Sequence, residues 1–496
     1  MRKSRHSSLH AVFYVVGRLL IVFGGLFIVP IIMSFFLKEY FIIPDFVYPA
    51  VISVFLGLLF VIIFRNEKVY YIQSILICGV AWIILSLVAA LPFFTATEKS
   101  FIDAFFEGAS GLTTAGITIY TNIEDLPRTI IFWRCFIQWI GSLGILTLFL
   151  VITFRSNSAY FHLFSAESTK IESSRPTPSI FKTIVILWSI YSFFTILEMI
   201  ILKMLGVSLF DSICHGLTNI STAGFSSHDE SILYFRNAGY KHYKLIEYTI
   251  ILFMFLGSTS FLLHYRILTG KFKDVFTNYE FKVYIYVIVV STLLMLIDHF
   301  HAFPKDFPKN LEEHFRNIFF TVVTFTSTTG YTTIDINSDY FPTLSKIIIF
   351  TLMFIGGCVG STAGGIKILR AIILYKLFVL QIKKLMLPRK AVAEVVYSNR
   401  IFPDAEIKRI VGIFFGWMFF ILIGGLITAF FTNLGPFEAI SGMLSAVSNI
   451  GPCFFSVEQM ANLPAIVKLV YIFGMIAGRL EILPLLLVFN PKAWKL

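Results

Sequence analysis

Long apolar runs follow one another along the chain and are separated by short polar segments. Each run holds about 20 residues or more, the length that an α-helix needs to cross the hydrocarbon core of a bilayer. The pattern predicts about ten membrane-spanning helices. We expect them near residues 11–36, 47–64, 70–95, 129–154, 180–205, 243–265, 280–299, 343–380, 408–432 and 463–489, with an interruption inside the eighth.

Four shorter apolar segments lie between pairs of these runs, all on the outer side of the predicted membrane. A length of about 10–15 residues is too short for a span and suits a half-helix that enters the membrane and turns back. The four segments are residues 101–112, 209–220, 312–326 and 436–447.

A strip rich in Ser and Thr follows each short segment and ends in glycine. The four strips read Thr113-Thr114-Ala115-Gly116, Ser221-Thr222-Ala223-Gly224, Ser327-Thr328-Thr329-Gly330 and Ser448-Asn449-Ile450-Gly451. Their glycines lie 108, 106 and 121 residues apart, so a unit of span, half-helix, strip and span repeats four times. We expect an N-terminal helix pair and four repeats, at residues 1–68, 69–178, 179–275, 276–404 and 405–496.

The repeated strips indicate an ion pore. Non-helical backbone is tolerated inside a membrane only where protein buries it or where it lines a watery path. Four equivalent strips can converge on one axis, where rings of carbonyl oxygens replace the hydration shell of a cation. Glycine allows the backbone angles that turn carbonyls inward, and the negative C-terminal ends of the half-helices favour a cation. The predicted fold class is an all-α polytopic membrane protein with four pseudo-symmetric helix–pore-loop–helix repeats around a central pore.

The composition agrees with a membrane protein, since 57% of the residues are hydrophobic and only 14% are charged. The net charge of +11 could indicate a nucleic-acid surface, but no basic–aromatic motif accompanies it. The basic residues instead cluster in short loops on one side, which predicts that these loops and both termini are cytoplasmic. Because the first apolar run is long, contains Arg18 and has no small-residue cleavage site, we expect a retained helix rather than a signal peptide. The five scattered cysteines suggest neither a metal site nor a disulfide framework.

A glycine-rich stretch interrupts the eighth predicted span and is a candidate gate. Each glycine costs helix stability by about 1 kcal/mol relative to alanine, and a broken helix at this depth should line water. The alternative is a small-residue surface on which helices pack. A nucleotide-binding P-loop is excluded because Ile366 separates the last glycine from Lys367 and no Ser or Thr follows. The candidate gate residues are Gly356, Gly357, Gly360, Ser361, Thr362, Gly364, Gly365 and Lys367.

Arg479 lies inside the last predicted span and completes the candidate gate. An intramembrane arginine is costly and usually faces protein or a watery cavity. We expect it to project beneath the strips, with a structural ion pair as the alternative. Glu481 is two residues away and points elsewhere on the helix, so it should pair with a base on another helix. Arg134 is expected to pair with Glu107 or Asp125 as structural support.

The motifs together resemble the TrkH/KtrB/HKT superfamily of potassium transporters over all four repeats. The residues that carry the resemblance are 110–116 (SGLTTAG), 221–229 (STAGFSSHD), 356–367 (GGCVGSTAGGIK), 449–452 (NIGP) and 478–481 (GRLE). The extra N-terminal helix pair is similar to the bacterial TrkH branch. The resemblance implies a potassium uptake pore in the bacterial inner membrane, a homodimer, and a cytosolic nucleotide-binding regulatory ring of the TrkA type. It also implies potassium selectivity, because sodium-type members carry Ser at the position of Gly116.

The fourth strip departs from the pattern, since Asn449 stands where the other strips have Thr and Ile450 stands where they have Ala or Thr. We therefore expect only pseudo-symmetry, with fewer good ion sites and less sharp discrimination. A sodium or mixed-cation conductor of the same fold and an ion-coupled symporter stay open as alternatives. Convergent intramembrane acids, bases and nucleophiles are few, so we predict no enzyme, and no cofactor besides potassium as substrate.

Overall fold

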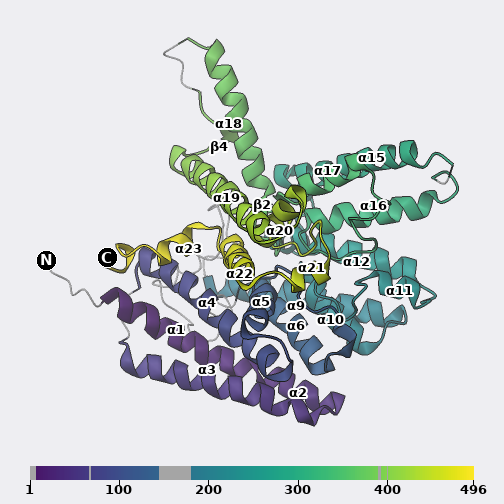
Figure 1. The fold of residues 1–496 in the computed structure, drawn as a ribbon. Coiled ribbons are helices and arrows are strands. Elements are labelled where there is room, and N and C mark those ends of the chain that lie inside the picture. Colours follow the sequence, from purple (N-terminus) through teal and green to yellow (C-terminus); the bar gives the residue numbers. More distant parts are fainter. Residues whose placement is uncertain are drawn as a thin grey trace.

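The computed structural model describes residues 7–65, 69–144, 180–305, 307–388, 393–398 and 400–495. It confirms the all-α fold class, because helices make up nearly all the regular structure in these ranges (Figure 1). The strands are two short pairs, β1 (Ile355–Gly356) with β2 (Ile366–Lys367) in parallel, and β3 (Val396–Tyr397) with β4 (Arg400–Ile401) antiparallel. The end of the fourth predicted span, residues 145–154, lies outside the described residues.

An N-terminal helical hairpin stands apart from the repeats. Its helices are α1 (Ser7–Leu26), α2 (Ile28–Leu37), the 3-10 turn η1 (Tyr40–Ile42) and α3 (Ile43–Ile63). Helices α1 and α3 pack along each other through glycines: a Cβ placed on Gly57 would lie 2.6 Å from the Gly17 carbonyl oxygen. Small residues allow such close approach of membrane helices. The hairpin is fixed to the first repeat where Phe27 stacks on Trp133, with ring centroids 4.8 Å apart.

Each of the four repeats contains an outer helix, a half-helix and an inner helix. Repeat 1 holds α4 (Tyr71–Ala96), α5 (Phe101–Leu112), η2 (Ile123–Asp125) and α6 (Arg128–Ser142). Repeat 2 holds α9 (Ile180–Met204), α10 (Leu209–Ile220), α11 (Leu233–Asn237), α12 (Tyr243–Ser258), α13 (Phe261–Leu268) and α14 (Lys273–Thr277). Repeat 3 holds α15 (Tyr279–Ala302), α16 (Leu311–Thr326), α17 (Thr343–Leu352), β1, β2, α18 (Ile368–Met386), β3 and β4. Repeat 4 holds α19 (Asp404–Phe431), α20 (Pro436–Ser448), α21 (Val457–Ala461), α22 (Ala465–Arg479), α23 (Leu483–Val488) and η4 (Ala493–Lys495).

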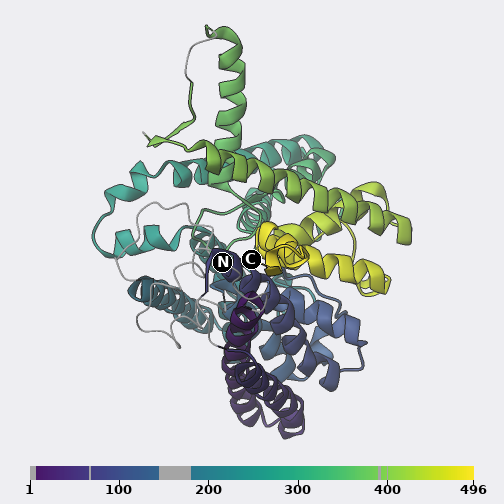
Figure 2. The ribbon, with the colours of Figure 1, turned by 90° about the vertical axis from the view of Figure 1, so that its left-hand side faces the viewer.

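The repeats close into a ring because each inner helix packs on the half-helix of the next repeat. Helix α6 contacts α10, α12 contacts α16, and α22 contacts α5, which joins the last repeat to the first. The remaining step is made by Phe350 of α17 and Phe437 of α20, whose ring centroids are 4.9 Å apart. Figure 2 shows the four repeats arranged around a common centre.

The inner helices of repeats 2, 3 and 4 are interrupted, and the end of the fourth predicted span lies outside the described residues, so fewer spans pass a length test than were expected. Within the described residues, six helices are long and apolar enough to cross a membrane, or seven if α12 and α13, bent by 99°, count as one. Helix α6 ends at Ser142, α17 ends at Leu352, and α22 ends at Arg479. Helix α18 resumes after the break in repeat 3 and projects from the rest of the molecule (Figures 1 and 2).

Candidate functional site

The four half-helices lie almost where the apolar segments predicted them. The predicted segments 101–112 and 209–220 correspond to α5 and α10, and α16 and α20 differ from their predictions by one residue. Serine side chains begin the first two, where Ser100 accepts from the Asp103 N–H at 3.2 Å and Ser208 from the Asp211 N–H at 3.0 Å. Such caps satisfy backbone donors that the helix itself leaves unpaired. The first three half-helices end directly before their strips, and α20 ends at Ser448, the first residue of the fourth strip.

All four strips begin with the same backbone turn. The second residue of each strip has a left-handed conformation, with φ of 61° at Thr114, 50° at Thr222, 55° at Thr328 and 54° at Asn449. This conformation is a genuine outlier for a β-branched residue, and outliers of this kind gather at functional sites. Asparagine adopts it more readily than threonine, so Asn449 suits the turn. This left-handed turn was not predicted, because nothing in a single Thr indicates a positive φ.

Hydrogen bonds join each turn to its half-helix. In the first strip the Thr114 N–H donates to the Gly111 carbonyl at 3.1 Å, and the Ala115 N–H donates to the Ser110 carbonyl at 2.9 Å. The same pair of bonds recurs in the other three strips. The pattern is a Schellman motif, which satisfies carbonyls at a helix C-terminus. The negative ends of the four half-helix dipoles therefore meet at the strips.

The four glycines close a ring around one centre. A Cβ placed on Gly116 would lie 2.3 Å from the Ala223 carbonyl oxygen, and one on Gly224 would lie 2.0 Å from that of Thr329. Continuing around, a Cβ on Gly330 would lie 1.8 Å from the Ile450 oxygen, and one on Gly451 would lie 3.2 Å from the Gly116 oxygen. All four glycines have positive φ, from 71° to 112°. Each strip therefore packs its glycine against the backbone of the next strip.

The side chains of the strips turn into the protein and leave the backbone to form the ring. The twelve residues that precede the glycines are at most 1% exposed. Gly116, Gly224 and Gly330 are only partly buried. A short passage lined by backbone oxygens is what this arrangement can provide, and it suits a cation without its hydration shell.

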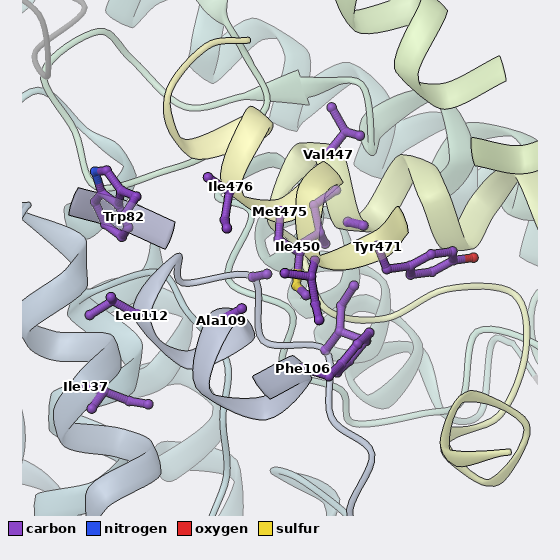
Figure 3. Packing of buried hydrophobic residues seen from close by; sticks show 14 of the residues in the cluster. Trp82, Phe106, Ala109, Leu112, Ile137, Val447, Ile450, Tyr471, Met475 and Ile476 are labelled. Atoms are coloured by element: carbon purple, nitrogen blue, oxygen red, sulfur yellow. The ribbon is translucent and has the colours of Figure 1, made fainter. Parts of the chain in front are cut away.

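The departures in the fourth strip do not disturb its backbone. Ile450 is fully buried in the apolar core, within a group of side chains from α4, α5, α6, α20 and α22 (Figure 3). The Asn449 amide donates to the Thr113 carbonyl at 3.3 Å and to the Met475 carbonyl at 3.1 Å. Both unusual side chains thus serve packing between repeats 4 and 1. The fourfold pattern is kept in the main chain.

The glycine-rich stretch forms a non-helical loop against the base of the strips. The Gly364 N–H donates to the Thr328 hydroxyl at 2.6 Å, and the Gly365 N–H donates to the Ser448 carbonyl at 2.9 Å. The Thr362 hydroxyl donates to the carbonyl of Ile220, the last residue of α10, at 3.0 Å. A Cβ on Gly364 would lie 2.2 Å from the Ser448 oxygen, so only glycine permits this approach. The contacts favour a loop beneath the strips over a helix-packing surface.

Arg479 lies at the same level and joins the loop to the first strip. Its guanidinium donates to the Thr114 hydroxyl at 3.1 Å, the Thr362 carbonyl at 3.4 Å and the Gly141 carbonyl at 2.9 Å, and also contacts the Ser142 carbonyl. Lys367 is buried and donates to the Ala363 carbonyl of the loop. The structure therefore brings all the candidate gate residues together.

Glu280 holds the base of the loop and was not predicted. Its carboxylate accepts from the Val359 N–H at 2.7 Å and from the Leu369 N–H at 3.3 Å. Glu481 pairs with Arg370 of α18, the base on another helix that was expected. In the sequence, Glu280 is an acidic residue at the start of an apolar run. Acidic residues are common at helix N-termini, so its position alone did not indicate contact with the loop.

A glycine lies at the end of three inner helices. A Cβ on Gly141 would lie 1.8 Å from the Leu112 carbonyl oxygen. A Cβ on Gly257 would lie 2.8 Å from the Ile220 oxygen, and one on Gly478 would lie 2.0 Å from the Val447 oxygen. The three oxygens belong to equivalent residues, each directly before a strip, so the inner helices rest on the half-helices at one level. Only the interruption of the helix in repeat 3 was predicted. At the other three sites the sequence contains merely a Gly followed by Ser or Arg.

Buried polar contacts support the ring from outside. Arg134 forms the expected pair with Glu107 at 2.8 Å, and both side chains are fully buried. On α6, Gln138 donates to the Ala223 carbonyl at 2.8 Å and accepts from the Phe225 N–H at 3.1 Å. Such contacts fix the position of strips that carry no regular secondary structure.

At the outer surface, His228 lies between Glu124 at 3.0 Å and Asp211 at 3.3 Å. Its ring also stacks on Tyr234 at 3.4 Å between centroids. Burial opposes protonation, but the hydrogen bonds and negative charges of Asp211 and Glu124 outweigh it and hold the pKa of His228 above its ordinary value. This group forms a small charged cluster near the start of the outer loop of repeat 2.

The chain matches known cation transport proteins along most of its length. Residues 50–496 match the family model described as TrkH, cation transport protein. The Trk system potassium uptake protein TrkH of Escherichia coli (strain K12) is 29% identical over 496 residues, which cover 98% of this chain and 99% of that protein. TrkH of Salmonella typhimurium (strain LT2) is 31% identical over 432 residues, 85% of this chain and 86% of that protein. The crystal structure of the potassium transporter TrkH from Vibrio parahaemolyticus matches with a TM-score of 0.85 at 27% identity, covering 98% of this chain and 99% of that one.

Proposed function

The chain belongs to the TrkH family of cation transport proteins, and from this membership we propose that it takes up potassium through the ring of glycine strips. The ring is the observation that carries the proposal. Four positive-φ glycines, each packed on the main chain of the next strip, leave backbone oxygens to surround a monovalent cation. In this proposal the strips, residues 113–116, 221–224, 327–330 and 448–451, form the selectivity filter.

The loop beneath the ring and Arg479 act as the gate. The loop bonds directly to residues of repeats 2, 3 and 4, and Arg479 bonds to Thr114 of repeat 1. A positive charge and a packed loop below the filter oppose the passage of a cation. Transport then requires that the loop withdraw, and the inside-negative potential drives the ion inward with about 2.3 kcal/mol per charge per 100 mV.

The chain is a multi-pass membrane protein, and we place it in a bacterial inner membrane with both termini in the cytoplasm. The basic loops on one side support this orientation. The relatives are named as parts of a Trk system, which supports a further component. We propose a homodimer that carries a cytosolic nucleotide-binding ring of the TrkA type. Exposed apolar side chains on the projecting α18, such as Tyr375, Phe378 and Leu385, offer surface for such contacts.

Cation flux in liposomes that contain the purified chain tests the proposed ion. We expect rubidium uptake driven by an inside-negative potential, with potassium as a strong competitor and sodium as a weak one. Equal competition by sodium would support a mixed-cation conductor instead. Uptake that follows an imposed proton or sodium gradient, and not the potential, would support a symporter.

The gate is tested by the same assay on Arg479→Ala and on a chain without residues 357–364. Both changes should raise basal flux, because each removes material that lies against the filter. Lys244→Ala, at an exposed ion pair on the outer surface, provides a control for handling of variants. Basal flux and regulation like those of the wild type in both gate variants would remove the gate assignment.

A further inference from the structure

Two threonine hydroxyls of the filter accept hydrogen bonds from the gate. Thr114 accepts from the Arg479 guanidinium at 3.1 Å, and Thr328 accepts from the Gly364 N–H at 2.6 Å. Both threonines occupy the second place of their strips and have the left-handed backbone described above. Both are at most 1% exposed, so no water reaches these hydroxyls while the loop is in place.

We propose that Thr114 and Thr328 are positioning residues that latch the gate to the filter, an inference that rests on the proposed potassium pore. They belong to the first and third strips, which lie opposite each other in the ring because the glycines follow the order 1, 2, 3, 4. The gate is therefore held at two points across the ion path. One point uses a side chain, Arg479, and the other uses the main chain of the loop.

The other two strips show that the latch is not a general property of the second place. Thr222 has the same residue type and a φ of 50°, but within the described part of the chain its hydroxyl bonds only to the Ser221 carbonyl, at 2.8 Å. Asn449 bonds to carbonyls of Thr113 and Met475. The gate touches strip 4 and the end of α10 through the main-chain carbonyls of Ser448 and Ile220. Among the described residues, side-chain hydrogen bonds with the gate are thus confined to two of the four equivalent positions, although the Asn449 side chain also packs close to Gly364.

The latch couples the state of the gate to the state of the filter. When the loop withdraws, each buried hydroxyl loses its donor and becomes free to face a hydrated path or an ion. A freed hydroxyl that faces the ion strengthens potassium binding in the open state. By linkage, bound potassium then favours release of the loop by the same factor.

Threonine-to-valine changes test the latch, since valine keeps the β-branched shape and removes only the hydroxyl. Thr222→Val measures what the loss of one filter hydroxyl does by itself. Relative to Thr222→Val, both Thr114→Val and Thr328→Val should raise the open probability without a regulatory partner by roughly two- to tenfold, the range expected for one hydrogen bond. Thr114→Ser and Thr328→Ser, which restore the hydroxyl, should return it to the wild-type value.

Double variants separate the two points of the latch in single-channel records. Thr114 acts through Arg479, so Thr114→Val should add nothing in an Arg479→Ala background. Thr328 acts through the main chain of the loop, so Thr328→Val should still raise the open probability in that background. Contacting residues give such non-additive effects and independent ones add. Thermal melts of every variant check that each one is folded.

Failure of the latch is distinct from failure of the proposed function. The latch is refuted if the wild type conducts potassium selectively but Thr114→Val and Thr328→Val behave like Thr222→Val. It is also refuted if the serine variants leak as much as the valine variants, which would indicate only a packing role. A wild-type chain that conducts no potassium would refute the proposed function itself, and the latch with it.

Discussion

Adding a single methyl group to each strip glycine of the proposed filter gives a graded test of the ring. The perturbation is Gly→Ala at Gly330, Gly224, Gly116 and Gly451 in separate variants. Every one of these positions has positive φ, so alanine carries a shared backbone cost of about 1–2 kcal/mol. What differs among them is the distance from the new Cβ to the carbonyl oxygen of the neighbouring strip.

The structure sets the order of the effects. To reach an ordinary contact of 3.4 Å, the facing oxygen would have to retreat by about 1.6 Å for Gly330, 1.4 Å for Gly224, 1.1 Å for Gly116 and 0.2 Å for Gly451. Those oxygens belong to the strips that would surround the ion, so a larger retreat should spoil the preference for potassium more. We expect at least a tenfold loss of potassium-over-sodium preference, about 1.4 kcal/mol, at Gly330 and Gly224, and a smaller loss at Gly116.

The assay is rubidium uptake into liposomes in competition with sodium. Gly239→Ala is the matched control, because Gly239 has φ of 76° and a Cβ there would meet nothing within 4 Å. It carries the backbone cost without the clash and lies in an outer loop, so selectivity should not change. Gly451→Ala reports backbone strain inside the ring with almost no clash. Equal selectivity losses in all four filter variants, or the reverse order, would refute the close packing of strip on strip.

Three further outcomes follow from contacts around the ring. Glu107→Gln leaves Arg134 buried without its charge partner and should destabilise the fold by about 3 kcal/mol in denaturation experiments, whereas Lys244→Gln at an exposed pair should cost far less. Similar losses of stability in the two variants would contradict the role of the buried pair. Glu280→Leu removes the acceptor of two main-chain N–H groups at the base of the loop, whereas Glu280→Gln keeps an acceptor oxygen, so the Leu variant should show the higher basal flux. Equal flux in the two variants would refute this anchoring role. Because the pKa of His228 is raised in the folded state, its stabilising effect should be fully present below about pH 6.5 and be lost as the pH rises through the folded pKa. Melting curves of the wild type and His228→Gln should therefore converge at alkaline pH. A difference that stays constant with pH would contradict the raised pKa.

The repeated features of the fold could be predicted from the sequence because they depend on local rules. Apolar length distinguished the half-helices from the spans, and the glycines at equal places in four strips pointed to one ring. The ends of α5 and α10 agree with the predicted segments to the residue. The clustering of loop residues 356–365 with Arg479 was also expected, from a glycine run and a buried charge at corresponding depths.

Features that depend on contact between distant segments could not be predicted. At Gly141, Gly257 and Gly478 a half-helix carbonyl comes too close for any side chain, and a lone glycine in an apolar run does not report that contact. The left-handed turns at the second place of the strips are enforced by bonds back to the half-helices. The packing role of Ile450 likewise depends on side chains from other helices (Figure 3).

The position of a heavy potassium analogue in the structure shows whether the ring of strips holds the ion. Crystals grown in rubidium should show anomalous scattering on the axis of the ring, within coordination distance of main-chain oxygens from all four strips. Rubidium held elsewhere by carboxylates, or a ring without rubidium in a chain that transports rubidium, would rule out the ring as the ion site.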